Sequence, residues 1–449
     1  MAVLKSRRYL GLLVLAALLG VPLSAFAYGF LKLSDLLQSW MYKDLPSGLG
    51  FASPPNWWPL PVLAVGGLLV ATIIRYLPGG GGESPADGFK PRGSAAGQAI
   101  PGIAIAALAT LGSGAVLGPE APLVALGAAL AALTIRSAKR DAPAQVIAVV
   151  GASGSFAAIG TLLGSPLAGA FLLMEAAGLA GSMLELVLIP GLLASAIGAL
   201  IFVGLDSWTG FGTFSLQVPQ LPGAPSPDVG QFGWALGIGV AAALLGWGLR
   251  KAAVILRSPV SRHRLLLTPI VAVAIAGLAV AYAEATGKAT SDVLFSGQSA
   301  MPALIDRSAE YSVGALLMLL LCKSIAYSAS LSSFRGGPTF PAMFLGAVGG
   351  VALSHLPALP LVTGVAMGIA AMTTAMLRLP LTAVLLTTLF LLPDALTVMP
   401  VEVVAVVVAY VVVIRLPDPT AGRGPKRPPT TTQIDPQPAS PEASASQPT

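Results

Sequence analysis

The sequence predicts an all-α polytopic membrane protein whose helices are partly broken within the membrane. Only 10% of its 449 residues are charged, whereas soluble domains carry roughly 25%. Hydrophobic residues make up 55% of the chain, and the mean hydropathy is +0.82. A lipid bilayer can accommodate that much apolar surface. The 51 glycines and 38 prolines also suit helices that pack closely or break within a membrane.

Uncharged runs follow one another along the chain, and their lengths indicate how the helices are arranged. A helix needs about 20 apolar residues to span a bilayer. Runs 142–174 and 336–377 are too long for one span, and runs 121–135 and 403–414 are too short. We therefore expect half-helices that reverse within the membrane, which is tolerated only where the freed backbone is buried or faces water. The other runs cover residues 10–31, 57–74, 94–119, 186–205, 229–249, 265–283 and 379–393.

Basic residues gather at the ends of the apolar runs, as they do in cytoplasmic loops. This distribution predicts a multi-pass protein of the cell membrane with a cytoplasmic N-terminus, and it does not fit nucleic-acid binding. Residues 10–31 also imitate a cleavable signal peptide, but their length favours a retained first helix. The basic groups are Lys5, Arg7 and Arg8; Arg136, Lys139 and Arg140; and Arg250, Lys251, Arg257, Arg262 and Arg264.

Patterns of catalytic and metal-binding residues are missing from the sequence. The single cysteine, Cys322, excludes an intrachain disulfide and every metal site with several cysteines. The chain has neither a phosphate-binding GxxxxGK[ST] loop nor an HExxH pair. We therefore expect no enzymatic activity and no cofactor.

An internal repeat divides the chain into two halves. The pattern GPxxPxxxLG begins at Gly118 and again at Gly337. Further along each half, the spacing from Gly154 to Pro166 recurs from Gly368 to Pro380. Transporter folds use such duplicated halves and place their substrate site at broken helices near the midplane. The expected segments are a cytoplasmic N-terminus 1–8, halves 9–215 and 229–415, a linker 216–228 and a disordered tail 416–449, which is also cytoplasmic.

Each GPxxP segment predicts a helix start suited to an anion. Proline is favoured in the first helical turn because its missing N–H would have been unpaired there. The free N–H groups of that turn attract an anion through partial charges, which bind it weakly enough for release. Glu120 lies inside the first such turn and is the one acidic residue between Asp87 and Asp141. Its carboxylate could occupy the anion site and leave when protonated, or it could only complement the helix dipole at a membrane surface.

These segments resemble the CLC family of chloride channels and transporters. The stretches 117–122, 164–175, 336–341 and 377–382 are similar to the family's GREGP, NAPLAGxLFxxEE, GGxFxP and R-x-P-L-T segments, in the family's order. The resemblance implies an inverted repeat with re-entrant helices and a homodimer with one anion pathway per subunit. It places Glu120 on the gating glutamate. The residues expected to line the anion site are Gly82, Ser84, Gly118, Ala121, Gly337, Thr339 and Phe340.

The sequence departs from the family pattern at several positions. Where the family has an anion-binding serine, this chain has Gly82, and Ser84 could replace it or only cap a short helix. Pro119 and Pro338 each lack an N–H group that relatives can direct at the anion. The family's proton-relay glutamate corresponds to Ala176, and its C-terminal tyrosine has no clear match. Tyr410 lies one helix too early.

The first hypothesis is a chloride-conducting protein gated by Glu120 with little or no proton coupling. One alternative is a proton-coupled antiporter in which Glu83 or Glu175 relays protons, although Glu175 could simply accept hydrogen bonds from backbone N–H groups. Another is a non-transporting membrane protein that retains the fold.

Overall fold

The computed structural model describes residues 6–89, 95–179, 182–210, 223, 226–391 and 395–420. The predicted linker 216–228, tail 416–449 and N-terminus 1–8 fall largely outside these ranges. The first half contains α1 (Arg7–Ser39), α2 (Leu45–Gly48), α3 (Pro59–Tyr76), α4 (Ile100–Ser113), α5 (Glu120–Ala138), α6 (Ala144–Leu163), α7 (Pro166–Ala177) and α8 (Ser182–Thr209). The second contains α9 (Val229–Arg262), α10 (Arg264–Thr286), α11 (Thr290–Val293), α12 (Met301–Asp306), α13 (Val313–Ser333), α14 (Thr339–Ser354), α15 (Leu361–Leu377), α16 (Pro380–Phe390) and α17 (Ala395–Arg415).

The described helices confirm the prediction of a polytopic α-helical membrane protein. Nine of them are long and apolar enough to cross a bilayer, within the ranges that the structure describes. The long run 142–174 is divided between α6 and α7, and the run 336–377 between α14 and α15. Helices α7, α14, α15 and α16 have 12, 16, 17 and 11 residues, which is short for a full span. The expectation of broken helices is therefore correct.

Local sequence signals explain the break between α6 and α7. Gly164 ends α6 in the left-handed conformation, with φ of 60°, which glycine adopts at little cost. The Ser165 hydroxyl then accepts a hydrogen bond from Ala168 N, and Pro166 occupies the first position of α7. The chain can thus reverse direction between the two helices, and the first turn of α7 is capped.

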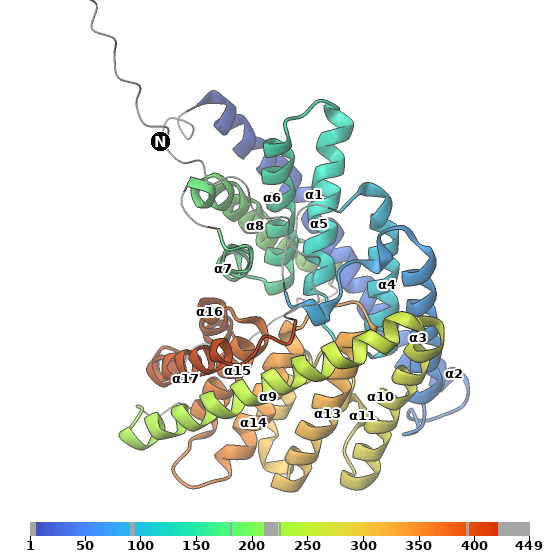
Figure 1. The fold of residues 1–449 in the computed structure, drawn as a ribbon, viewed down its shortest axis with the longest axis vertical. Helices are drawn as coiled ribbons and strands as arrows, with labels where there is room; N and C mark the ends of the chain where they lie inside the picture. Colours follow the sequence, from blue (N-terminus) through green and yellow to red (C-terminus); the bar gives the residue numbers. More distant parts are fainter. Residues whose placement is uncertain are drawn as a thin grey trace, which may run out of the picture.

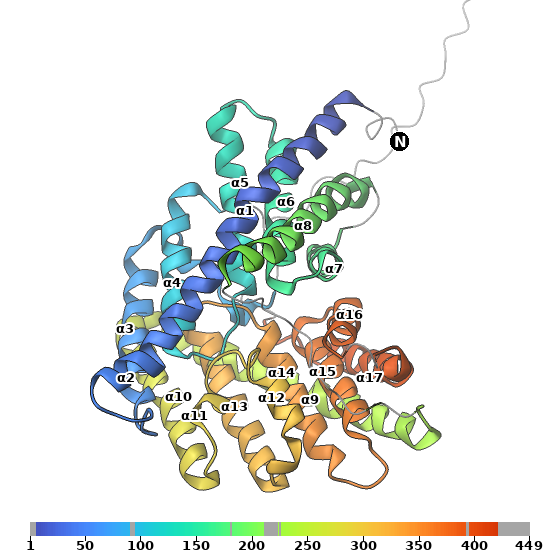
Figure 2. The ribbon, with the colours of Figure 1, turned by 180° about the vertical axis from the view of Figure 1, so that it is seen from behind.

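The helix contacts of the first half recur in the second. Helix α1 packs against α6 and α8, and α9 packs against α15 and α17 in the same way. Helix α5 packs on α6 as α14 packs on α15. Helices α5 to α8 lie at the top of Figure 1 and α13 to α17 at the bottom, and Figure 2 shows α1 alongside α8. The α3–α10 contact joins the two halves.

Glycines allow the broken helices to pack closely. A Cβ atom on Gly127 of α5 would collide with the Gly154 carbonyl oxygen on α6, and one on Gly346 of α14 would collide with that of Gly368 on α15. Contacts between small residues of this kind are common in membrane helix pairs. They hold α5 and α14 in place, so that their first turns meet at the centre of the molecule.

Candidate functional site

The two GP turns meet in an antiparallel bridge between the halves. Gly118 N donates to Gly337 O at 2.8 Å, and Gly337 N donates to Gly118 O at 2.6 Å. Helices α5 and α14 begin directly after this bridge, at Glu120 and Thr339. The repeat seen in the sequence therefore brings its two copies into direct contact, and the candidate site lies at their junction.

Glu120 is fully buried at this junction. Its Oε1 accepts a hydrogen bond from Phe340 N in the first turn of α14, at 2.9 Å. Its Oε2 and the hydroxyl of Thr339 are both buried without a hydrogen-bond partner in the part of the chain described. The carboxylate of Glu120, from the first half, thus lies at the N-terminus of α14, which belongs to the second half.

Two glycines make room for this carboxylate. A Cβ atom on Gly118 would lie 2.6 Å from Glu120 Oε1 and 2.7 Å from its Cδ. One on Gly337 would overlap Oε2 and lie 2.7 Å from Cδ. No side chain larger than hydrogen fits at either position while Glu120 stays in place. Gly118 and Gly337 therefore form a cradle for the Glu120 carboxylate.

This arrangement places the carboxylate where a helix N-terminus can stabilise negative charge. A helix N-terminus offers free N–H groups and the positive end of the helix dipole. Helix α14 has 16 residues, long enough to carry a substantial dipole. An inorganic anion could use the same donors only after Glu120 has left.

The predicted anion-binding residues divide into different roles. The N–H groups of Gly118 and Gly337 are used by the bridge, so these residues supply space rather than donors. Phe340 supplies the N–H that Glu120 accepts, and Thr339 lies beside it. Ala121 lies next to Glu120 in the first turn of α5.

The loop that holds Gly82 and Ser84 does not lead directly into a long helix. Only two short 3₁₀ turns, Pro78–Gly81 and Pro85–Asp87, are formed there. The N–H of Gly82 donates to Gly79 O at 3.0 Å and is unavailable to an anion. The hydroxyl of Ser84 makes no cap bond and is buried without a partner among the described residues.

Two side-chain hydroxyl groups accept hydrogen bonds from the backbone just before each of the two bridge glycines. Val116 N donates to Ser330 Oγ at 3.0 Å, and Arg335 N donates to Thr110 Oγ1 at 3.3 Å. The two bonds are related by the repeat. Val116 and Arg335, the donors, are about as far apart in the sequence as the two GP turns, and so are Thr110 and Ser330, the acceptors.

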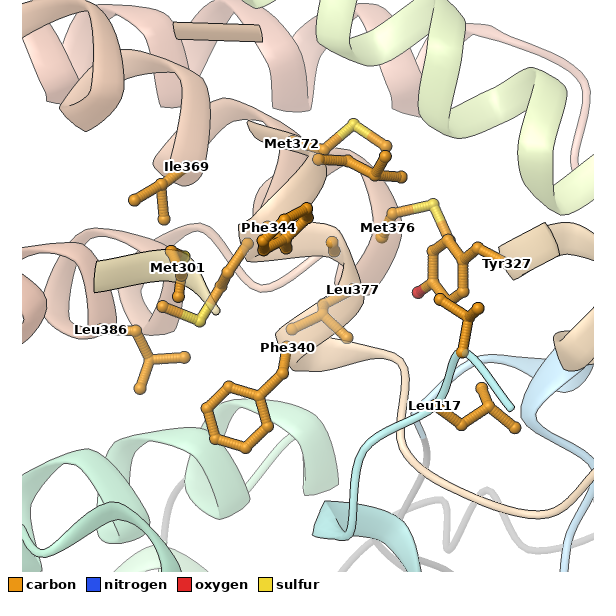
Figure 3. Packing of buried hydrophobic residues seen from close by; sticks show 14 of the residues in the cluster. Leu117, Met301, Tyr327, Phe340, Phe344, Ile369, Met372, Met376, Leu377 and Leu386 are labelled. Carbon is orange, nitrogen blue, oxygen red and sulfur yellow. The ribbon is translucent and has the colours of Figure 1, made fainter. Parts of the chain in front are cut away.

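Tyr327 of α13 makes a third hydrogen bond to the backbone beside the bridge. It is fully buried, and its hydroxyl donates to the Pro338 carbonyl at 2.6 Å. Leu117, Tyr327 and Phe340 belong to the large cluster of buried hydrophobic residues that Figure 3 shows in part.

The acidic residues suggested as proton relays lie in unlike surroundings. Glu175 accepts hydrogen bonds from Leu381 N at 3.1 Å, and from the N and Oγ1 of Thr382 at 2.8 and 2.6 Å. It therefore caps the first turn of α16. Glu83 is exposed at the loop that contains Ser84. Within the described ranges, no group of three or more His, Cys, Asp or Glu side chains could hold a metal ion.

Three buried residues were missed by the sequence analysis. Tyr327 and Arg335 lie in or next to the run before the second GP turn, and only the charge of Arg335 signalled its importance. Glu402 of α17 is fully buried, and both of its carboxylate oxygens lack a partner in the described part of the chain. The sequence feature that could have revealed Glu402 is its position as an acidic residue at the edge of the last apolar run.

Comparison with known proteins connects this site to a family. The family model described as a voltage-gated chloride channel matches residues 88–413. YfeO of Salmonella paratyphi A, provisionally named an ion-transport protein, is 29% identical over 365 residues, which is 79% of this chain and 84% of that protein. YfeO of Salmonella typhimurium has the same identity and coverage.

Solved structures share the fold. A slow cyanobacterial Cl⁻/H⁺ antiporter superposes with a TM-score of 0.71 at 19% identity, covering 90% of this chain and 94% of that one. A CLC-type fluoride/proton antiporter gives a TM-score of 0.66 at 18% identity, covering 89% and 94%. The predicted fold, with its inverted repeat and re-entrant helices, is confirmed.

Proposed function

The chain belongs to the voltage-gated chloride channel family, and from that premise we propose that it carries chloride or another small anion across the cell membrane along a pathway closed by Glu120. One observation supports this most strongly. The Glu120 carboxylate is buried at the N-terminus of α14, where it accepts the Phe340 N–H.

The closed pathway follows from the chemistry of that position. The ionised carboxylate and the transported anion compete for the same N–H donors. Protonation removes the negative charge and weakens the charge-assisted hydrogen bond, so the side chain can leave and an anion can take its place. Because the donors carry only partial charges, the bound anion is released quickly.

Flux measurements on the purified full-length protein in chloride-loaded liposomes test this proposal. Chloride efflux and external pH are recorded together, for the wild type and for Glu120→Gln. We expect efflux without proton movement in the wild type, and a flux in Glu120→Gln that no longer responds to pH. A Glu120→Gln protein with the pH response of the wild type would remove Glu120 from the gate.

Proton-coupled antiport is the second candidate, favoured by the description of two similar structures as antiporters. Stoichiometric proton movement with chloride would establish it. Glu83→Gln and Glu175→Gln then separate the two suggested relays, since only the true relay abolishes coupling. The contacts of Glu175 with α16 favour a capping role, so Glu83 is the first variant to make.

A membrane protein without transport activity is the third candidate. Well-folded protein that gives no anion flux in liposomes would favour it over both transport mechanisms. A homodimer in the bilayer is also part of the proposal, and cross-linking in native membranes tests it.

A further inference from the structure

Lys323 is a fully buried cation in the middle of α13. Its Nζ donates to four successive backbone carbonyl oxygens, those of residues 292–295, at 2.8, 3.1, 3.0 and 3.3 Å. The same Nζ lies over the ring of Phe344, 4.3 Å from the ring centroid. An ammonium group has three N–H donors, and these contacts use all of them. We call residues 292–295 and Phe344 the carbonyl cage.

The carbonyl cage compensates the charge of Lys323. A buried ammonium group is costly unless its surroundings balance it. The last carbonyl oxygens of a helix have no partner within the helix, and the cage takes them from the end of α11. The carboxylate of Asp292 lies within electrostatic range of Lys323, and it accepts hydrogen bonds from the hydroxyls of Tyr282 and Tyr311 at 3.4 and 3.1 Å. The cage is therefore built around a cation.

One residue of the carbonyl cage has a strained backbone. Phe295 has a φ of 59°, in the left-handed region that bulky side chains seldom adopt. Such a residue persists only where its surroundings hold it, and strain of this kind gathers at functional sites. The Phe295 carbonyl accepts from Lys323 Nζ, and its ring packs edge-on against Tyr42 with the ring centroids 5.0 Å apart. Lys323 thus stabilises a conformation that phenylalanine does not favour.

Phe295 connects the carbonyl cage with the segment that leads to Glu120. Its N–H donates to Gly114 O at 3.0 Å, at the point where the chain leaves α4. Tyr42 binds the same point, because its hydroxyl donates to Ser113 O at 2.7 Å. A Cβ atom on Gly114 would lie 2.7 Å from that hydroxyl and 3.5 Å from the Phe295 ring. The chain is therefore enclosed between these two side chains shortly before it reaches Glu120.

The same face of α13 contacts the backbone around the bridge. Lys323, Tyr327 and Ser330 are spaced as i, i+4 and i+7, which places them on one side of the helix. All three are fully buried. Ser330 accepts from Val116 N, and Tyr327 donates to Pro338 O. One helix face therefore holds the approaches to both GP turns, and Lys323 makes the first of its three contacts.

We propose that Lys323 is a positioning residue for the Glu120 gate. By holding residues 292–295 against Gly114, it keeps the first GP turn where the Glu120 carboxylate reaches the N–H of Phe340. This inference rests on the proposed gating role of Glu120, and it adds a residue that acts on the carboxylate through the backbone. Removal of the ammonium group releases Phe295, loosens the turn and displaces the carboxylate.

Hydrogen exchange of the full-length protein in lipid nanodiscs tests this link independently of transport. Lys323→Met removes the charge but keeps a long unbranched side chain. Loss of one hydrogen bond to a charged group changes an equilibrium by about tenfold or more, so the N–H groups of Phe295 and Val116 should exchange faster by at least that factor. Ser324→Ala is the control, because that neighbouring hydroxyl is buried without a partner among the described residues. Wild-type exchange at both N–H groups in Lys323→Met would overturn the proposal.

Chloride efflux from liposomes tests the effect on the gate. The ratio of efflux at acidic pH to efflux at neutral pH does not depend on the amount of folded protein. We expect Lys323→Met to lower this ratio by raising efflux at neutral pH, and to change nothing further in a Glu120→Gln protein. A purely structural role would reduce efflux equally in both backgrounds and leave the ratio unchanged, and that result would overturn the proposal. A wild-type ratio in Glu120→Gln would refute the gate itself, while the exchange rates would still show whether Lys323 holds the segment.

Phe344→Leu provides a second variant that keeps Lys323 in place. It removes the ring over the ammonium group, and a desolvated contact of this kind changes an equilibrium by several-fold. We expect faster exchange at Phe295 and a lower efflux ratio, both smaller than in Lys323→Met. If Lys323→Met does not fold, unchanged exchange and an unchanged ratio in Phe344→Leu would overturn the proposal.

Discussion

If Glu120 closes the anion pathway as we propose, replacing Gly337 by alanine should open it. The added Cβ atom would overlap Glu120 Oε2 and lie 2.7 Å from Cδ and 3.0 Å from Cβ of that residue. The Glu120 side chain is flexible and can swing away, so the fold should survive while the carboxylate loses its place. Gly337 is not among the residues with positive φ, so alanine suits its backbone.

The magnitude follows from the contact that is lost. A hydrogen bond to a charged group contributes about 1.5–3 kcal/mol, and the bond from Phe340 N to Glu120 is of this kind. Its loss shifts the ratio of displaced to seated carboxylate by roughly 10- to 100-fold. Chloride efflux at neutral pH should rise towards that factor, and its dependence on pH should weaken.

The assay is chloride efflux from liposomes at several pH values, with Gly349→Ala as the matched control. Gly349 lies on the same helix α14, and a Cβ atom there would meet nothing within 4 Å. We expect the control to behave like the wild type. Equal efflux and equal pH response in Gly337→Ala, Gly349→Ala and the wild type would refute the idea that the seated carboxylate closes the pathway.

Three further predictions concern stability and are measured as thermal unfolding midpoints of the purified protein in detergent. Tyr327→Phe leaves the buried Pro338 carbonyl without its donor, so it should cost about 1–3 kcal/mol and lower the midpoint; an unchanged midpoint would mean that water replaces the hydroxyl. Glu402→Leu removes a buried carboxyl group that has no partner among the described residues and should raise the midpoint by a similar free energy, whereas a lower midpoint would indicate a needed polar contact. Gly346→Ala would bring a Cβ atom onto the backbone of α15 and should lower the midpoint, while Gly349→Ala should leave it unchanged or slightly raised.

Sequence analysis predicted the broken helices from the lengths of the uncharged runs, and the structure shows that local residues mark the helix ends. Gly164, Ser165 and Pro166 together specify the end of one helix and the start of the next. The repeat of GPxxP segments likewise located the two turns that meet at the centre. The isolation of Glu120 in an uncharged run marked it as a candidate functional residue, since an ionisable group within a membrane is costly.

The contacts across the bridge could not be predicted in the same way. Gly118 and Gly337 were expected to line the anion site, but each N–H donates to the carbonyl oxygen of the other residue because the halves meet there. The partners of Arg335, Gly80 and Gly82, belong to the other half of the chain. Pairings over such separations depend on how the halves dock, and no local pattern records that.

The positions related by the repeat carry different charges, and this has a consequence for conduction. Glu120 corresponds to Thr339, and Arg335 corresponds to Val116, when the two GP turns are aligned. With identical halves, the electrical profile of the pathway would be the same from either face of the membrane, and opposite voltages would drive equal currents. A carboxylate from one half and a guanidinium from the other remove that equality. We therefore expect currents that rectify, with a direction set by these two residues.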